Sequence, residues 1–277
     1  MGAWVHLITV GASIAQHAIN DGFFSEQGIS KLPGLEHAFR KGALSRSSVS
    51  LSLVPYVDEK PKERSAELNT CMDLLLDGYE RGLQQYVYLF HTDTEVGRLC
   101  AEVLQGYLDR FSREECGGRI AVLDPVEIEH LGDPRMFREG LANLLEGIAA
   151  HTKSHKRKGD TVFVHATGGF KPETAMALLA SNLPTTGAPV FYVHEHFEEV
   201  VRIPAVPLRP RRWRRFDGLM DHLLTVGGVP RSVLDGRFVR RVIDEAVRLG
   251  WAEEVAGEIA PSAMGRLLWR RLLAIVR

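Results

Sequence analysis

The sequence predicts an α/β domain with a mostly parallel sheet, followed by a smaller C-terminal domain of another kind. In residues 1–204, short apolar runs alternate with helical segments of about ten to fifteen residues, which is the pattern of βαβ units. After Pro207 this alternation stops, and arginine-rich and helical stretches follow. The length of 277 residues, 45% of them hydrophobic, suits either one large domain or a medium domain with a small one.

Strands are expected where apolar and β-branched residues run together, and helices where apolar residues recur at helical spacing. The expected strands are 5–10, 50–55, 86–90, 119–123, 161–165 and 189–194. The expected helices are 14–19, 65–79, 95–111, 136–151 and 172–181. The Gly- and Ser-punctuated residues 23–48 are expected to form a mobile flap, and residues 153–160 a solvated basic loop.

The C-terminal part has the outline of a winged helix-turn-helix. Helices are expected over 216–226, 238–249 and 262–276, with a turn at 227–232 and a short hairpin around Gly257. The stretch RPRRWRR, residues 209–215, is expected to be a basic linker. The predicted division is therefore an α/β domain over residues 1–208 and a winged-helix-like domain over residues 209–277.

Charge is distributed unevenly along the chain. The net charge is −1, but residues 205–277 contain 14 Arg, no Lys and 8 Asp or Glu, which gives +6. Residues 1–204 have the remaining 20 basic and 27 acidic side chains, which gives −7. Long-range attraction can bring a polyanion to the C-terminal part, whereas the larger part needs a focused local site to bind one.

Composition argues against several classes of protein. Cys71, Cys100 and Cys116 are an odd number without CxxC spacing, so neither a disulfide framework nor a zinc ribbon is indicated. No apolar run approaches the ~20 residues of a membrane span. The first residues, MGAWVHLITVGAS, lack the basic region and cleavage site of a signal peptide. We therefore expect a cytoplasmic protein without membrane contact.

The stretch HATGGFKPE, residues 165–173, has the physical features of a phosphate site. Gly168 and Gly169 allow positive φ and a close approach of ligand to main chain. The helix that follows points its unpaired N–H groups and positive dipole end at the same place, and Lys171 adds a full positive charge. The Walker pattern is absent, and no acidic cluster follows that would hold magnesium, so a metal-free reaction is favoured. The alternative is a tight strand-to-helix turn with an exposed lysine.

The stretch TVGAS, residues 9–13, likewise places a glycine turn between the end of a strand and the start of a helix, with a hydroxyl in place of the lysine. Gly11 and Ala12 form the turn, and Ser13 is expected either to cap the following helix or to contact a ligand. A third polar turn, made of Thr92, Asp93 and Thr94, follows the strand 86–90. The carboxyl ends of parallel strands meet at one edge of the sheet, and ligands bind there in open α/β sheets. A shared site is therefore predicted at this edge.

Two histidine patterns have weaker implications. His194 and His196 alternate along a strand and share a face, which suits a metal ion, but no third ligand is apparent and a structural role is favoured. His165 is expected to be packed or hydrogen-bonded rather than a general base. Neither a metal nor a cofactor is expected.

Six segments, in order along the chain, resemble a CRISPR-associated group of CARF-domain proteins that includes the archaeal ring nucleases. They are TVGAS (9–13), SAELNT (65–70), HTDTEVGRLCAEVL (91–104), FREGLANLLEGI (137–148), HATGGFKPE (165–173) and FYVHEHFEEVVRIP (191–204). The resemblance covers about residues 3–208, and ATGGFKPE and VHEHFEE are its most specific parts. It implies a Rossmann-like CARF domain that binds cyclic oligoadenylates across the two-fold axis of a homodimer.

The resemblance also implies an activity and its residues. In the ring nucleases, a serine after the first strand and a lysine after the Gly-Gly turn cut cyclic tetra-adenylate without a metal, and Ser13 and Lys171 match them. The ribose 2′-OH attacks the neighbouring phosphate in line, which gives di-adenylates with 2′,3′-cyclic phosphates and switches off type III CRISPR signalling. The ligand-binding residues expected from the turns at the sheet edge are Gly11, Ala12, Thr92, Asp93, Thr94, Thr167, Gly168, Gly169 and Phe170.

Two other functions stay open at this point. The first is a regulator that binds DNA through the C-terminal domain in response to the cyclic oligoadenylate, or a CARF sensor with little turnover. The second is a CARF ribonuclease, because Arg215 and His222 fit the R-x6-H spacing of HEPN ribonucleases. The C-terminal segment is short for a HEPN domain, which makes this reading the weaker one.

Overall fold

The chain divides into two compact units. The structure, a computed structural model, describes residues 2–169, 171–183, 186–193, 200–205 and 213–276. The first unit contains the described residues of the ranges 2–182 and 186–205, and residues 213–276 belong to the second. The boundary expected at residue 208 lies outside the described residues, so the division at that residue stays a prediction.

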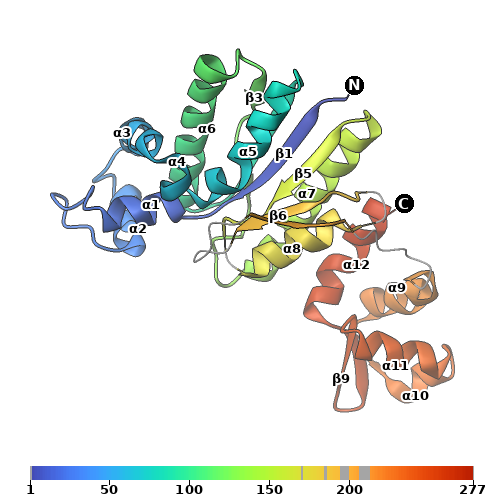
Figure 1. The fold of residues 1–277 in the computed structure, drawn as a ribbon. Coiled ribbons are helices and arrows are strands. Elements are labelled where there is room, and N and C mark those ends of the chain that lie inside the picture. The colour runs from blue at the N-terminus through green and yellow to red at the C-terminus, as the bar shows by residue number, and fades with distance from the viewer. Residues whose placement is uncertain (1, 170, 184–185, 194–199, 206–212, 277) are drawn as a thin grey trace. The chain divides into compact units, whose positions relative to one another are not determined.

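The first unit is built on a seven-stranded sheet that is parallel except at one edge (Figure 1). Its strand order is β3-β2-β1-β5-β6-β7, and β4 also pairs with β2. Only β7 runs antiparallel to its neighbour, β6. The strands are β1 (Trp4–Val10), β2 (Gln85–Thr92), β3 (Ile120–Val122), β4 (Val126–Ile128), β5 (Thr161–His165), β6 (Val190–Val193) and β7 (Val200–Ile203). The predicted α/β fold with a mostly parallel sheet is thereby confirmed.

Helices cover both faces of this sheet, with α5 and α6 on one face and α7 and α8 on the other (Figure 1). Because the sheet is covered on both sides, its central strand β1 is buried on both faces over six of its seven residues. The helices are α1 (Ser13–Asn20), α2 (Leu32–Arg40), α3 (Arg46–Glu59), α4 (Pro61–Arg64), α5 (Ala66–Glu80), α6 (Glu95–Glu115), α7 (Phe137–Arg157) and α8 (Lys171–Ser181).

The predicted strand at residues 50–55 is wrong, because these residues lie inside α3. Ser45 caps this helix, its hydroxyl accepting a hydrogen bond from the Ser48 N–H at 3.4 Å. Leu53 and Val57, four residues apart, are fully buried, while the Leu51 side chain is 76% exposed. The alternation of Ser and Leu suggested a half-buried strand, but the buried residues recur at helical spacing.

The expected flap over residues 23–48 is also wrong in its main part. Residues 32–40 form α2, and its Leu35 and Phe39 belong to the same hydrophobic core as Phe24. The expected basic loop at 153–160 is wrong as well, since α7 continues to Arg157. The sequence reading did not include the short strand β4, which extends the sheet along the second half of β2.

The second unit has its own small core and a three-stranded sheet of order β8-β10-β9. Its elements are η1 (Trp213–Phe216), α9 (Asp217–Val226), β8 (Val229–Pro230), α10 (Arg231–Asp235), α11 (Arg240–Arg248), β9 (Ala252–Val255), β10 (Glu258–Pro261) and α12 (Ala263–Val276). The expected hairpin around Gly257 is β9 with β10. The expected turn at 227–232 instead contains β8 and the start of α10. Its assignment as a winged helix stays a prediction.

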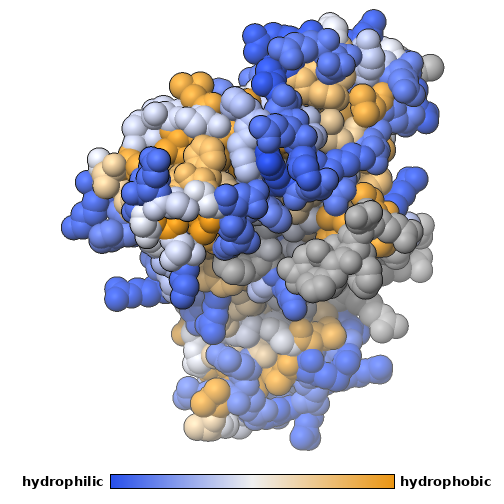
Figure 2. Space-filling view, turned by 60° about the vertical axis from the view of Figure 1, so that its left-hand side comes forward, coloured by the Kyte–Doolittle hydropathy of each residue, from blue (hydrophilic) through white to orange (hydrophobic). Residues whose placement is uncertain are grey.

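No helix in the described part of the chain combines the length and the apolar character needed to cross a membrane. On the face shown in Figure 2, hydrophobic residues lie in separate small areas among hydrophilic ones.

Candidate functional site

The candidate site lies where the chain changes direction across the sheet. From β1 the chain proceeds to β2 and β3 on one side, and it returns through β5 to β6 on the other. β1 and β5 pair in parallel, from Trp4 with Thr161 to Ile8 with His165, so the turns after both strands lie at the same edge. Such a switch point is where ligands bind in open α/β sheets.

The two glycine turns at this edge touch each other. A Cβ atom added at Gly11 would lie 2.5 Å from the Gly169 nitrogen. A Cβ at Gly168 would overlap the Thr9 carbonyl oxygen and lie 2.5 Å from the Gly11 nitrogen. Thr9 Oγ1 further ties the turns together by donating to the Gly168 oxygen at 2.8 Å. The close backbone packing explains why neither turn has a side chain at these positions.

Ser13 does not cap the helix that it begins, so that expectation is wrong. The N-cap position of α1 belongs to Ala12, which makes no side-chain capping bond, and Ser13 is the first residue of the helix. Instead, Ser13 Oγ donates a hydrogen bond to Glu67 Oε2 at 2.7 Å and accepts one from the Ala66 N–H at 3.3 Å. Ser13 is partly exposed.

Glu67 is the residue of this site that sequence reasoning missed. Its side chain is only 1% exposed, and it lies in the first turn of α5. Its Oε1 accepts from the Gly11 N–H at 2.8 Å, and its Oε2 accepts from Ser13 and from the Ser65 hydroxyl, the latter at 2.9 Å. The Gly11 N–H therefore serves the buried carboxylate. The one sequence signal was its position in SAELNT, a segment of the resemblance.

The hydroxyl of Thr167 is also used within the fold. Thr70 Oγ1 donates its proton to the Ala66 oxygen at 2.8 Å, so Thr167 Oγ1, 2.6 Å away, donates to Thr70. The Val193 N–H donates to Thr167 Oγ1 at 3.1 Å. Thr167 thus links α5 to β6 beside the turn, and a ligand role for its hydroxyl stays a prediction.

Lys171 is the first residue of α8, immediately after the second glycine turn. Its side chain is exposed, and within the described part of the chain it makes no hydrogen bond or ion pair. Gly169, two residues earlier, has a φ of +102°, a conformation that L side chains rarely adopt. The ammonium group therefore follows a backbone turn that glycine makes possible. Phe170, the remaining predicted contact, lies outside the described residues.

A pair of neutral histidines lies under the β5 turn. His6 Nδ1 and His165 Nε2 are 3.0 Å apart, and His6 Nε2 is 3.0 Å from Gln85 Oε1. Because Gln85 Nε2 donates to the Leu75 oxygen, its Oε1 accepts from His6, and His6 Nδ1 accepts in turn from His165. Burial lowers the pKa of His6 to about 4 and also lowers the pKa of His165. This geometry agrees with a packed, hydrogen-bonded His165.

The third predicted turn, at residues 92–94, is occupied by bonds within the chain. Asp93 accepts from the backbone N–H groups of His130 and Gly132, at 2.9 and 2.6 Å. Thr94 caps α6 by accepting from the Gly97 N–H at 3.0 Å, and Thr92 Oγ1 lies 2.8 Å from Thr94 Oγ1. An open cavity of about 350 Å³ borders Asp93 and Thr94. A ligand role for the three residues stays a prediction.

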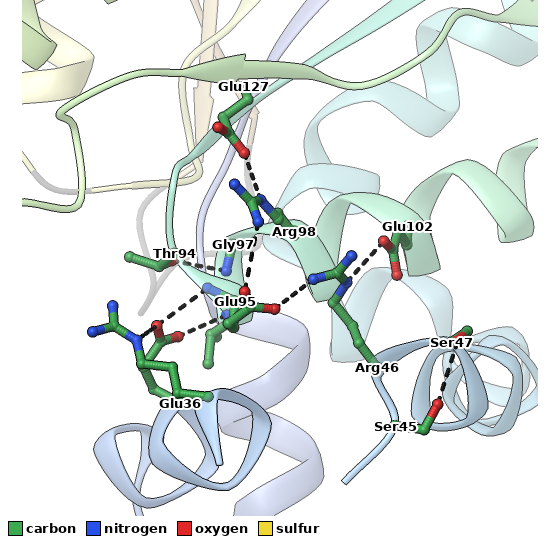
Figure 3. Close-up of polar contacts among 12 residues, drawn as sticks. Glu36, Ser45, Arg46, Ser47, Thr94, Glu95, Gly97, Arg98, Glu102 and Glu127 are labelled. Atoms are coloured by element: carbon green, nitrogen blue, oxygen red, sulfur yellow. Dashed lines mark hydrogen bonds and ion pairs between the residues drawn. The ribbon is translucent and has the colours of Figure 1, made fainter. Parts of the chain in front are cut away.

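The start of α6 is held by a carboxylate from another helix (Figure 3). Glu36 of α2 accepts from the backbone N–H groups of Glu95 and Val96, at 3.2 and 2.9 Å. Arg46, at the start of α3, forms ion pairs with Glu95 and Glu102 of α6 (Figure 3). The helix N-terminus that would attract an anion here is already filled by the protein's own anion.

Two weaker patterns of the sequence are the pair His194 and His196 and the spacing of Arg215 and His222. No group of three His, Cys, Asp or Glu side chains that could hold a metal ion occurs among the described residues. His194 and His196 lie outside those residues. In the second unit, the Arg215 guanidinium pairs with Glu245 and lies 4.8 Å from the centre of the Phe216 ring. This ion pair joins η1, which contains Arg215, to α11, which contains Glu245.

Comparison with known protein families shows to which family the chain belongs. Residues 62–206, slightly more than half of the 277-residue chain, match the model of the family described as CRISPR-associated protein (Cas_APE2256). The chain belongs to this CRISPR-associated family. The matched region includes Glu67 and the second glycine turn, and the CRISPR association inferred from the sequence is confirmed.

Two solved structures are similar over nearly the whole chain, at low identity. Protein VC1899 from Vibrio cholerae is 11% identical with a TM-score of 0.31, covering 98% of this chain and 66% of that one. Can2 from Sulfobacillus thermosulfidooxidans, solved in complex with cyclic tetra-adenylate, is 9% identical with a TM-score of 0.29, covering 99% of this chain and 63% of that one. The chain therefore spans slightly less than two thirds of each of these proteins.

Proposed function

We propose that this chain is a CARF-type ring nuclease that binds cyclic tetra-adenylate and cleaves it without a metal ion. It acts as a homodimer, with Ser13 and Lys171 of each subunit at the ring, and it removes the second messenger of type III CRISPR signalling. Membership of the CRISPR-associated family supports the biological setting. The activity and its residues are the proposal.

One observation carries this proposal, namely the direct contact between the turns that precede Ser13 and Lys171. A Cβ at Gly11 would lie 2.5 Å from the Gly169 nitrogen, and each active side chain follows its glycine by two residues. The hydroxyl and the ammonium group therefore start from one spot on the sheet edge. The two groups differ in chemistry as such a reaction requires, one a hydroxyl with fixed partners and the other an exposed cation.

The reaction needs positioning and charge stabilisation more than an added nucleophile. A ribose 2′-oxygen forms a bond to the adjacent phosphorus, the P–O5′ bond breaks, the 2′-OH proton is released, and the 5′-oxygen takes up a proton. Holding the 2′-OH in line can lower the barrier by about 7–11 kcal/mol. Lys171 would stabilise the negative charge that builds on the non-bridging phosphate oxygens.

The test uses labelled cyclic tetra-adenylate in the presence of EDTA. Wild type is expected to release di-adenylates over many turnovers, and Lys171→Ala to lower kcat by about 100- to 1,000-fold, the usual effect of removing one group that stabilises transition-state charge. Lys158→Ala, an exposed lysine at the end of α7, is the matched control and should retain full activity. Cleavage that survives in Lys171→Ala, or that EDTA stops, would contradict the proposal.

A ligand-responsive DNA-binding regulator is the second candidate, favoured by the helix and hairpin order of the second unit. Its helix α11 exposes Arg240, Arg241 and Arg248, which suit phosphate contacts. The hairpin, by contrast, exposes Glu253 and Glu254, which oppose such contacts. Ring binding without turnover, together with ring-dependent DNA retention that Arg240→Glu abolishes, would favour this candidate over the nuclease.

A further inference from the structure

We propose that Glu67 fixes the Ser13 hydroxyl as a hydrogen-bond acceptor toward the ligand, so that Ser13 contacts a ribose 2′-OH and not a phosphate oxygen. Glu67 is thus a positioning residue. The inference rests on the proposed function, because it names the group of the cyclic oligoadenylate that Ser13 recognises.

The first step is the number of protons on Ser13. A serine hydroxyl has one proton and two acceptor lone pairs. In the structure the proton is directed to Glu67 Oε2 at 2.7 Å, and one lone pair accepts from the Ala66 N–H at 3.3 Å. Within the described residues Ser13 makes no other side-chain hydrogen bond. What it can offer outward is its second lone pair.

The second step is the rigidity of Glu67. Its side chain is 1% exposed and receives three donors, from the Gly11 N–H on Oε1 and from Ser13 and Ser65 on Oε2. A Cβ at Gly168 would overlap Oε1, so the second turn packs on the carboxylate. The group cannot turn away to release the Ser13 proton without leaving buried donors unpaired, at a cost of about 1–3 kcal/mol each.

The third step is the chemistry of the ligand. A phosphate oxygen bears no proton at neutral pH and can only accept, so it cannot pair with a hydroxyl that offers a lone pair. It would also lie near the negative charge of Glu67. A ribose 2′-OH can donate, and when it donates to Ser13 its own lone pairs are free to face the phosphorus. The phosphate is then left to Lys171.

The test compares the affinities of cyclic tetra-adenylate and its 2′-deoxy analogue in EDTA, measured by rapid-mixing competition before turnover. Wild type is expected to prefer the ribose ring by about 5-fold or more, the value of one or more hydrogen bonds. Ser13→Ala should lose about 5-fold of that preference. Glu67→Gln should lose it as well. The Gln Oε1 is needed by the Gly11 N–H, so its amide N–H faces Ser13 and reverses the polarity of that bond.

Control measurements separate the causes. Glu63→Gln removes an exposed charge four residues from Glu67 and should leave the preference unchanged. If Glu67→Gln does not fold, the comparison of wild type with Ser13→Ala still decides. A preference that persists in Ser13→Ala, or that is absent in a wild type that binds both rings tightly, overturns this inference alone. Failure of wild type to bind either ring overturns the proposed function instead.

Discussion

Two regions at the same sheet edge use an acidic side chain in opposite ways. The first region is the pair of glycine turns that follow β1 and β5, and the second is the turn between β2 and α6. At the second, Glu36 closes the N-terminus of α6 from outside and leaves no unpaired N–H at Glu95 and Val96 for a ligand (Figure 3). At the first, Glu67 is buried beneath the glycine turns and leaves Ser13 partly exposed above it. The polar groups that follow these strands therefore have different partners within the fold.

The difference lies in which side of the turn the carboxylate approaches. Glu36 comes from α2, which packs against α6 and α1, and its carboxylate binds the N–H groups at the start of α6. Glu67 comes from α5, which packs against β1 and β5, so its charge supports the turn from within. The exposed cation, Lys171, is the first residue of α8, and the buried Glu173 of the same helix packs on the turn before it, since a Cβ added at Gly169 would overlap Glu173 Oε2.

Among the substitutions that test this comparison, Gly168→Ala is expected to have the largest effect on stability and ring binding. The added Cβ would overlap Glu67 Oε1 and the Thr9 oxygen, so the two turns must separate. We expect a loss of about 3 kcal/mol in the free energy of unfolding, the upper end of the usual cost of overpacking, together with loss of ring binding. Urea denaturation and ring binding measure the two effects.

The matched change is Gly34→Ala in α2, where the nearest atom to the added Cβ is a methyl carbon of Ile29 at 3.7 Å. Its effect on stability should be small, or slightly favourable because alanine suits a helix interior. Equal stability of the two variants would show that the glycine turns are not in contact as described.

Much of the fold was predictable because the strands and helices of the first unit follow their periodicities closely. The strand 161–165 and the helix beginning at Glu95 have the expected positions. The strand proposed at 50–55 failed because Leu51 faces solvent, and a single exposed leucine turned a helical pattern into an apparent alternation. Local pattern cannot tell which of several leucines is buried, since that depends on packing.

The candidate site was predictable only in part. The glycine turns and the two side chains proposed to act on the ring could be named because glycine, hydroxyl and lysine after a strand have a local chemical meaning. Glu67 could not be named, because it is 54 residues from Ser13 in the chain and acts through a tertiary contact. An acid in the first turn of a helix usually serves the helix dipole, and nothing local distinguishes this one.

The second-largest effect expected is a pH dependence of stability that comes from the buried histidines His6 in β1 and His165 in β5. Burial lowers the pKa of His6 to about 4 from an ordinary value near 6.5. Between pH 7 and pH 5 the unfolded chain binds a proton on His6 that the folded chain does not, so stability falls as the pH falls. The expected loss from His6 is about 2 kcal/mol over this range.

Urea midpoints measured at several pH values test this effect. His6→Gln should lose about 2 kcal/mol less stability than wild type between pH 7 and pH 5, while the buried His165 keeps its own contribution. His17→Gln, which replaces an exposed histidine of α1, is the matched control. If His6→Gln and wild type lose the same stability between pH 7 and pH 5, His6 does not contribute to the pH dependence.

The smallest effect expected is that of Glu36→Ala, which tests the difference between Glu36 and Glu67. Removing the carboxylate leaves the N–H groups of Glu95 and Val96 without their partner, which should cost about 1 kcal/mol, the usual value of a lost helix cap. Glu36→Gln keeps one acceptor and should cost less. Because Glu36 binds the N-terminus of α6, whereas Ser13 and Lys171 follow the two glycine turns, ring affinity and the preference for ribose over 2′-deoxyribose should stay as in wild type. A loss of ring binding in Glu36→Ala at unchanged stability would mean that the second turn also contacts the ligand.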